Sequence, residues 1–307
     1  MLDKFSREIN YLRVSITDRC NLHCEYCRPK EGISLKGHED ILRYEEIIRV
    51  VSIAVKMGLI KVRVTGGEPL VRRGFIHFIE GLNKIGGLQD ISLTTNGILL
   101  AQFARQIFEA GIHRINISLD SLNKDKYFRI TRGGNLDDVM RGIARAEEAG
   151  FAPIKINTVA IKDFNDDEVL DFARLAADKP FQVRFIELMP VGKETDPGYS
   201  GNFIPAAGVI EKIKREFELF SYNAKQVLLA CCINRSPSTI EDISVITGLK
   251  RDIVIGAVEE IKRLFLLPKP TIIKEAPRFD VNINTRSVVI DLLPENWYTE
   301  NVRNLVK

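Results

Sequence analysis

The stretch that decides the fold reads Leu12-Arg13-Val14-Ser15-Ile16-Thr17-Asp18-Arg19-Cys20-Asn21-Leu22-His23-Cys24-Glu25-Tyr26-Cys27. Its β-branched part, residues 13–17, predicts a strand, and that strand runs directly into a polar loop with three cysteines. The same rhythm recurs along the chain. Further strands are predicted at 61–65, 91–95, 114–119, 154–159 and 183–188, and helices at 44–57, 75–85, 99–110, 136–149 and 167–177.

Six strands that alternate with helices predict a parallel sheet with right-handed crossovers. Polar segments follow the strands at their carboxyl ends: Gly66-Gly67-Glu68-Pro69, Asn96-Gly97, Ser118-Leu119-Asp120-Ser121 and Glu187-Leu188-Met189-Pro190. A doubly wound sheet concentrates its site at one switch point, whereas a barrel builds its site from many strand ends. We therefore predict an α/β fold, a partial (β/α)6 TIM-like barrel.

The character of the chain changes after Pro190. Residues 192–205 are rich in Gly and Pro, and helices are predicted at 208–217, 225–232 and 250–264, with a capping box at Ser238-Thr239-Ile240-Glu241. Strand-like pieces follow near 271–274, 279–283 and 287–292. This order predicts three parts: a barrel at 1–192, a linker or lid and helix at 193–221, and a winged-helix-like α+β accessory domain at 222–307.

Composition bounds the partners. The 307 residues are 45% hydrophobic and 28% charged, with a net charge of +3, which is ordinary globular composition and too weakly basic to favour nucleic acid or an acidic membrane. No apolar run is long enough to span a bilayer, and the first residues show no signal peptide. We expect a cytoplasmic protein.

The spacing of Cys20, Cys24 and Cys27 points to a metal centre. Three soft thiolates select zinc, copper(I) or an iron–sulfur cluster. A four-iron cluster on three cysteines keeps one iron open, whereas zinc needs a fourth ligand, such as His23 or the pair Cys231-Cys232. A buried helix face is the other alternative, but the neighbours are polar.

Six motifs in register resemble the radical S-adenosylmethionine (SAM) enzymes, in the subgroup that contains the GTP cyclase of molybdenum-cofactor synthesis. Besides the cysteine loop they are 65–73 (TGGEPLVRR), 93–97 (LTTNG), 117–122 (ISLDSL), 154–159 (IKINTV) and 184–192 (RFIELMPVG). The likeness covers about residues 10–192. It implies one [4Fe-4S] cluster that chelates SAM, whose reductive cleavage to a 5′-deoxyadenosyl radical leads to hydrogen abstraction from the substrate.

The resemblance also assigns roles. Cys20, Cys24 and Cys27 would hold the cluster and are the catalytic and metal-binding residues. The SAM-binding residues would be Gly66, Gly67 and Glu68 at the methionyl amino end, Thr94, Ser118 and Asn96 at the carboxylate and ribose, and Met189 at the adenine. An electron donor such as flavodoxin or ferredoxin is implied. Glycines suit close backbone approach to such a ligand.

Basic residues lie inside the predicted strands. They are Arg13, Lys61, Arg63, Lys155 and Arg184. A barrel interior accepts charge when something pairs with it, and in the resembled cyclase the matching positions bind a triphosphate. We therefore expect a phosphorylated or nucleotide-like small substrate.

The C-terminal third departs from the resembled cyclase, which carries a second three-cysteine cluster there. The adjacent Cys231-Cys232 cannot reproduce it, and Val227, Leu228 and Ile233 nearby favour two buried helical thiols. GTP cyclisation toward the molybdopterin precursor is therefore an alternative function. Peptide modification, with the tail recruiting a peptide or protein partner, is a second. A cluster-bearing nucleic-acid-binding regulator is a third, disfavoured because the longest C-terminal helix mixes basic and acidic residues.

Overall fold

The computed structural model describes residues 4–29, 32–179, 181–189, 202–218, 220–233, 239–263, 271–273 and 276–278. These residues fall into two compact units. The first lies within 1–165 and 184–203, and the second within 166–183 and 204–307. The division at 192 and 221 stays a prediction. Within the described residues, no helix is both long and apolar enough to cross a bilayer.

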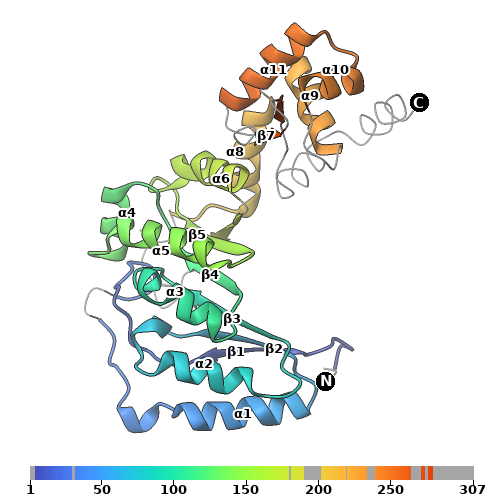
Figure 1. Cartoon of the computed structure of the whole chain (residues 1–307). Helices are drawn as coiled ribbons and strands as arrows, with labels where there is room; N and C mark the ends of the chain where they lie inside the picture. The colour runs from blue at the N-terminus through green and yellow to red at the C-terminus, as the bar shows by residue number, and fades with distance from the viewer. Residues whose placement is uncertain are drawn as a thin grey trace. The chain divides into compact units, whose positions relative to one another are not determined.

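A six-stranded sheet with the order β1-β2-β3-β4-β5-β6 forms the first unit (Figure 1). The strands are β1 Tyr11–Ser15, β2 Lys61–Thr65, β3 Asp90–Thr95, β4 Arg114–Ser118, β5 Ile154–Ala160 and β6 Phe181–Glu187. The pairs from β1 to β5 are parallel. The predicted β/α alternation is thus confirmed, with strand ends that differ from the predicted ones by at most about two residues.

Helices follow the strands and cover one face of the sheet. In the first unit they are α1 Tyr44–Lys56, α2 Phe75–Asn83, α3 Leu100–Glu109, α4 Lys124–Thr131 and α5 Leu136–Ala149, with short 3-10 turns at His38–Asp40 and Pro69–Val71. Their apolar sides pack on the sheet because apolar residues recur every three to four positions. Val62, Leu93 and Ile117 on the sheet are fully buried beneath them.

The other face of the sheet is polar. On β2, β3 and β4 the residues that alternate with the buried apolar ones are partly exposed or polar, as expected when successive side chains point to opposite faces. The register places Arg13, Arg63, Ser92 and Arg114 in one row across β1 to β4. One row further along, Thr94 pairs with Asn116 and Asn116 with Lys155. Ser118 pairs with Asn157 in the last row.

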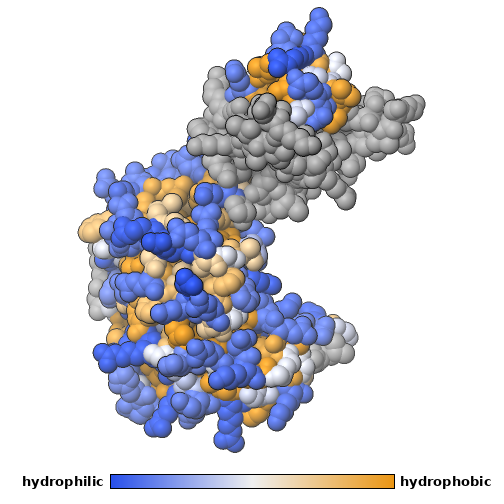
Figure 2. All heavy atoms as spheres, in the orientation of Figure 1, coloured by the Kyte–Doolittle hydropathy of each residue, from blue (hydrophilic) through white to orange (hydrophobic). Residues whose placement is uncertain are grey.

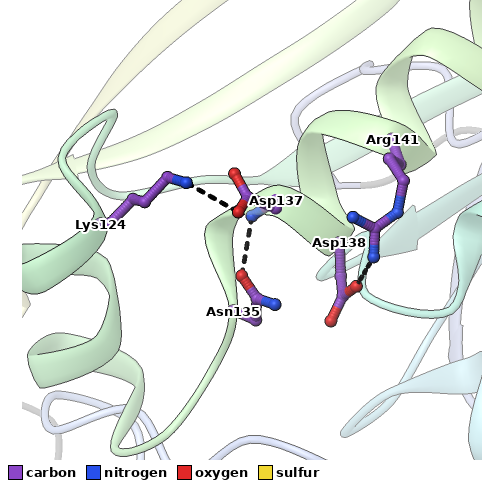
Figure 3. Close-up of polar contacts among 5 residues, drawn as sticks. All are labelled: Lys124, Asn135, Asp137, Asp138 and Arg141. Carbon is purple, nitrogen blue, oxygen red and sulfur yellow. Dashed lines mark hydrogen bonds and ion pairs between the residues drawn. The ribbon is translucent and has the colours of Figure 1, made fainter.

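Helix α4 was not predicted, because its sequence is polar and short. It begins where the Asn123 side chain accepts hydrogen bonds from the amides of Asp125 and Lys126. Helix α5 begins in the same way at Asn135, whose side chain accepts from the amide of Asp137 (Figure 3). Lys124 of α4 forms a 2.7 Å ion pair with Asp137, so the two capped helix starts are joined.

The second unit holds a turn and helix after β5 and the C-terminal helices. These are a 3-10 turn Asp166–Glu168, α6 Val169–Asp178, α8 Ala206–Glu218, α9 Tyr222–Ile233, α10 Ile240–Thr247 and α11 Arg251–Arg263, with an antiparallel pair β7 Thr271–Ile273 and β8 Ala276–Arg278. Buried side chains of α9, α10 and α11, among them Val227, Ile243 and Val254, form one apolar cluster.

Two predictions about this second unit need comment. The capping box lies one residue later than predicted, because Thr239 is the N-cap and Asp242 closes the box with bonds of 3.1 and 2.8 Å. Three helices and a hairpin follow the predicted winged-helix order. The strands predicted near 279–283 and 287–292 lie outside the described residues, so the winged-helix assignment stays a prediction.

Charged and apolar residues are interspersed over the visible face of the first unit (Figure 2). Exposed apolar side chains do recur on α1, where Val50, Ile53 and Met57 are each about half exposed. The polar inner face of the sheet is therefore the feature to examine for function.

Candidate active site

The three cysteines lie in one loop between β1 and α1, and the loop is held against the end of α4. The amide of His23 donates to the Thr131 carbonyl at 3.2 Å, and that of Glu25 donates to the Ile130 carbonyl at 2.9 Å. Arg132, the C-cap of α4 with φ 54°, donates to the carbonyl of Arg28 at 3.1 Å. The loop therefore has a defined outline before any cofactor binds.

The sulfur of Cys20 already receives hydrogen-bond donors. The Leu22 amide lies 3.4 Å from it and the Asn96 side-chain nitrogen 3.7 Å from it. Donors aimed at a cysteine sulfur are typical of thiolates that ligate iron–sulfur clusters, where they tune the reduction potential. The donor set of this loop thus fits a cluster.

Burial is the largest cause that raises the pKa of Cys24 well above its usual value, and the charges of Asp120 and of the neighbouring cysteines add to it. Burial likewise raises the pKa of Cys20. Both thiols are therefore protonated at neutral pH in the chain alone, and metal binding must release their protons. The mutual influence of the three thiols shows that they lie near one another.

The alternatives for a single metal ion find no support in the described part of the chain. There, no group of three or more His, Cys, Asp or Glu side chains forms a site for one metal ion. His23 is exposed. Cys231 and Cys232 lie in α9 as predicted, but their side chains are outside what the structure describes.

Gly66 and Gly67 bring the end of β2 against the start of the cysteine loop. The Gly67 amide donates to the Thr17 carbonyl at 2.6 Å, and the Glu68 amide donates to the Arg19 carbonyl at 2.8 Å. A Cβ atom on Gly66 would lie 2.6 Å from the Thr17 oxygen, and one on Gly67 would come closer still to that of Arg19. The glycines therefore permit a close approach between two backbone segments.

Glu68 is fully buried and joins the ends of β2 and β3. Its carboxylate accepts from the Thr95 hydroxyl at 2.7 Å, the Asn96 amide at 2.7 Å and the Leu70 amide at 3.1 Å. Burial raises its pKa, while these three donors oppose that shift. Sequence reasoning assigned Glu68 to a ligand; the structure shows that its side chain also braces the strand ends.

The other predicted SAM-binding residues lie along the carboxyl ends of the strands. Thr94 and Ser118 are on the polar face of β3 and β4, and Asn96 contacts the cysteine loop through Cys20 and through Asn21 at 2.8 Å. Met189 follows β6 and is exposed. We call the residues that follow the strand ends and contact the cysteine loop the rim: Cys20, Cys24, Cys27, Glu68, Asn96, Ser118 and Asp120.

Four cations gather on the inner face below the rim. They are Arg63, Arg114, Lys155 and Arg184, named here the basic cluster. Burial lowers the pKa of Lys155, and the charges of Arg184, Arg114 and Arg63 lower it further. Burial also lowers the pKa of Arg184, with Arg63 and Arg114 adding to the shift. Arg63 and Arg184 therefore lie close enough to repel.

Few groups neutralise the basic cluster. Among the described residues, one carboxylate pairs with it: Asp90, 3.5 Å from Arg114. Arg63 stacks over the Tyr11 ring at 5.3 Å. Of the other predicted basic residues, Arg13 is the register partner of Arg63 and exposed, and Lys61 pairs one row lower with Asp90.

Sequence reasoning missed three residues of this site. Arg114 completes the basic cluster, and its place two residues before Asn116 on a polar strand face was a usable signal. Tyr26 and Asp120 form a 2.7 Å hydrogen bond across 94 residues of sequence. No local pattern could have paired them, because the contact depends on how the loop folds onto β4.

A parallel half-barrel with a three-cysteine loop at its carboxyl rim defines a class of protein, the iron–sulfur enzymes that use SAM. The family model named Radical SAM superfamily matches residues 14–176, and the chain belongs to that superfamily. Its enzymes use a [4Fe-4S] cluster and SAM, as the sequence predicted.

Curated relatives are about half identical to this chain. A GTP 3′,8-cyclase of Moorella thermoacetica is 52% identical over 219 residues, which cover 71% of this chain and 67% of that protein. A GTP 3′,8-cyclase of Desulforamulus reducens is 45% identical over 251 residues, covering 80% and 77%. The predicted resemblance to the GTP-cyclase-like subgroup is thereby confirmed.

A solved structure supports the barrel. The crystallised enzyme anSMEcpe, a histidine-tagged protein with bound AdoMet, has a TM-score of 0.54 at 15% identity and covers 96% of this chain and 94% of that one. Methylornithine synthase has a TM-score of 0.51 at 14% identity, covering 66% and 61%. At these identities the likeness shows the fold, and the predicted TIM-like partial barrel is confirmed.

Proposed function

We propose that this chain is a radical SAM enzyme that abstracts a hydrogen atom from a nucleoside triphosphate, and that GTP is its first candidate substrate. The observation that carries the proposal is the basic cluster, which sets four cations against one paired carboxylate, Asp90. The name GTP 3′,8-cyclase, shared by relatives at about half identity, supports the choice of GTP and of 3′,8-cyclisation as the reaction.

A triphosphate suits the basic cluster better than a single carboxylate would. Half-buried cations that lower one another's pKa repel, and a ligand with several negative charges removes that repulsion. Guanidinium groups pair two oxygens of a phosphate at once, and a lysine adds a point charge. Arg13 and Lys61, placed beside this cluster by the strand register, would extend the same surface.

The rim residues take the cofactor roles in this proposal. When bound, the cluster and SAM supply a 5′-deoxyadenosyl radical for hydrogen abstraction. The chain holds the cluster through Cys20, Cys24 and Cys27. Around SAM, contacts would come from the backbone of the glycine turn, the side chains of two inner strands and the residue after β6: Gly66, Gly67, Glu68, Thr94, Asn96, Ser118 and Met189. These residues bind and orient, which is the protein's share of such chemistry.

The base of the substrate needs a different holder from that of the resembled cyclase. The sequence contains five cysteines, three in the loop and an adjacent pair at 231–232, so it does not repeat a spaced three-cysteine site. We therefore propose that this chain carries one cluster and recognises GTP mainly through its phosphates. A flavodoxin- or ferredoxin-like protein would donate the electron.

Anaerobic reconstitution followed by nucleotide binding tests this proposal. We expect about four irons per chain and binding that weakens in the order GTP, GDP, guanosine, measured by calorimetry without reductant. With reductant, SAM and GTP, we expect 5′-deoxyadenosine and a 3′,8-cyclised guanine nucleotide in equal amounts. About eight irons per chain would contradict the single-cluster arrangement. Equal affinity for GTP and guanosine would contradict phosphate recognition.

A further inference from the structure

A buried hydrogen bond joins the middle of the cysteine loop to the end of β4. Tyr26 lies between Cys24 and Cys27, and its hydroxyl donates to the Asp120 carboxylate at 2.7 Å. Asp120 is 3% exposed and stands two residues after Ser118, the last residue of β4. The bond therefore connects two of the cluster ligands to the strand that carries a predicted SAM contact.

Asp120 is itself held in place from two further directions. Its second carboxylate oxygen accepts from the Val159 amide of β5 at 2.9 Å. Its backbone carbonyl accepts from the Asn165 side chain at 2.6 Å, and the same Asn165 nitrogen reaches the Val159 carbonyl at 2.8 Å. With three such bonds, Asp120 is a fixed point of the sheet rather than a surface carboxylate.

Apolar packing closes around the tyrosine. Tyr26 packs against a buried cluster of Ile130, Ile161 and Leu188, together with Val159 and Phe164. Leu188 directly precedes Met189, the predicted adenine contact. The environment of Tyr26 thus includes α4, the end of β5 and the end of β6, which leaves its ring little freedom to move.

The other anchors of the loop hold different parts of it. The amides of His23 and Glu25 bind α4, and Arg28 donates to the Asp18 carbonyl at the start of the loop. These bonds hold the loop against a helix or against itself. The bond from Tyr26 instead refers Cys24 and Cys27 directly to the sheet.

We propose that Asp120 is a positioning residue that acts through Tyr26 and sets the placement of Cys24 and Cys27 relative to Ser118. Since the loop holds the cluster and the strand end holds SAM, this bond would fix the distance between the two cofactors. The inference requires the radical SAM class and no particular substrate, so it stands or falls independently of the choice of GTP.

The test compares anaerobically reconstituted full chains of the wild type, Tyr26→Phe, Asp120→Ala and Asp120→Asn. Tyr26→Phe removes one oxygen and keeps the packed ring, so folding is expected to survive. We expect about four irons per chain, but a weakened change in the electron paramagnetic resonance spectrum of the reduced cluster on SAM addition. The rate of 5′-deoxyadenosine release at saturating SAM should fall about tenfold or more, since small misplacements of reacting groups are costly.

The conservative variant supplies the rescue. An asparagine at 120 can accept from the Val159 amide and donate to the Tyr26 oxygen, so Asp120→Asn should retain the spectral change and stay within about twofold of the wild-type rate, whereas Asp120→Ala should behave like Tyr26→Phe. Tyr44→Phe is the matched control, because Tyr44 lies on α1 and its hydroxyl makes a long 3.4 Å contact with the Arg72 carbonyl.

Two results would overturn the inference. One is a Tyr26→Phe chain with the wild-type spectral response and rate, which would make the bond dispensable. The other is loss of iron in Tyr26→Phe, which would assign the bond to cluster retention. Failure of the wild type to bind GTP would affect the proposed substrate and leave these readouts intact.

Discussion

The rim and the basic cluster lie on the same face of one sheet, yet their polar groups are satisfied in opposite ways. At the rim, Glu68 accepts three hydrogen bonds from the chain and Asp120 accepts two on its carboxylate. In the basic cluster, Lys155 and Arg184 have lowered pKa values because of burial and the neighbouring cations. The rim is complete before a ligand arrives, whereas the basic cluster is not.

The difference separates two tasks of a binding site. Groups that must hold reacting atoms in place gain from a shell that fixes them in advance. Groups that capture a charged ligand gain from a repulsion that the ligand relieves. Variants of the rim should therefore damage geometry or stability, and variants of the basic cluster should damage affinity while leaving the fold intact.

The largest expected effect is at the rim. Cys24→Ala removes one of three thiolates, so iron content after reconstitution should fall from about four per chain to background, and SAM cleavage with it. Iron assay and 5′-deoxyadenosine quantification measure this. Cys231→Ala on α9 is the control and should keep both. Intact SAM cleavage in Cys24→Ala would place the cluster elsewhere.

A second, smaller effect is expected in the basic cluster. Lys155→Met and Arg184→Leu should each weaken GTP binding about 10- to 100-fold, because hydrogen bonds to charged groups contribute about 1.5–3 kcal/mol. Without nucleotide, the free energy of unfolding should stay constant or rise, since repulsion is relieved. Calorimetry and urea unfolding measure the two quantities.

Arg105→Leu on the outer helix α3 removes an equal charge from an exposed ion pair with Glu109 and serves as control for the binding measurement. Its GTP affinity should match that of the wild type. A Lys155 or Arg184 variant that lost stability and kept its affinity would reverse the contrast between rim and basic cluster.

A third effect follows from the burial of Asp120. Desolvation raises its pKa from 3.8 to about 6, so the folded chain binds this proton more tightly than the unfolded chain. The contribution to stability is therefore present below about pH 4 and is lost as pH rises to 6, by on the order of 2 kcal/mol. The difference in free energy of unfolding between wild type and Asp120→Asn, measured without metal at pH 4 and 6, should show it. A pH-independent difference would contradict the raised pKa.

The smallest effect tests a place outside both regions. Asn135→Ala removes the side-chain cap at the start of α5, drawn in Figure 3, and should lower the free energy of unfolding by about 1 kcal/mol. GTP affinity and iron content should not change. A loss of either would show that the outer helices influence the site more than the contrast allows.

Much of the fold could be predicted because apolar residues alternate along each strand and recur with helical spacing between them. β2 and α5 have the predicted bounds, Lys61–Thr65 and Leu136–Ala149. Helix α4 was missed because its polar sequence carries little periodic signal and depends on the Asn123 cap. The C-terminal capping box shifted by one residue because Ser238 and Thr239 are chemically similar cap residues.

The site was predictable as a set of residue types and much less as a set of contacts. The cysteine spacing indicated the cluster, and basic residues in strands indicated an anion. Glu68 bracing two strand ends and Tyr26 bonding to Asp120 both required knowledge of distant neighbours. Arg114 was overlooked because its own strand showed one basic residue, and the cluster forms across several strands.

The even spacing of side chains along β4 gives the pocket a ruler. Arg114, Asn116 and Ser118 share one face, and four residues of strand span about 13 Å from the first to the last. A molecule held at its anionic end by the arginine must have its reactive carbon at that height to meet the radical. Shortening the phosphate chain by one unit would leave the reacting carbon short of that mark, so the strand selects its substrate by length as well as by charge.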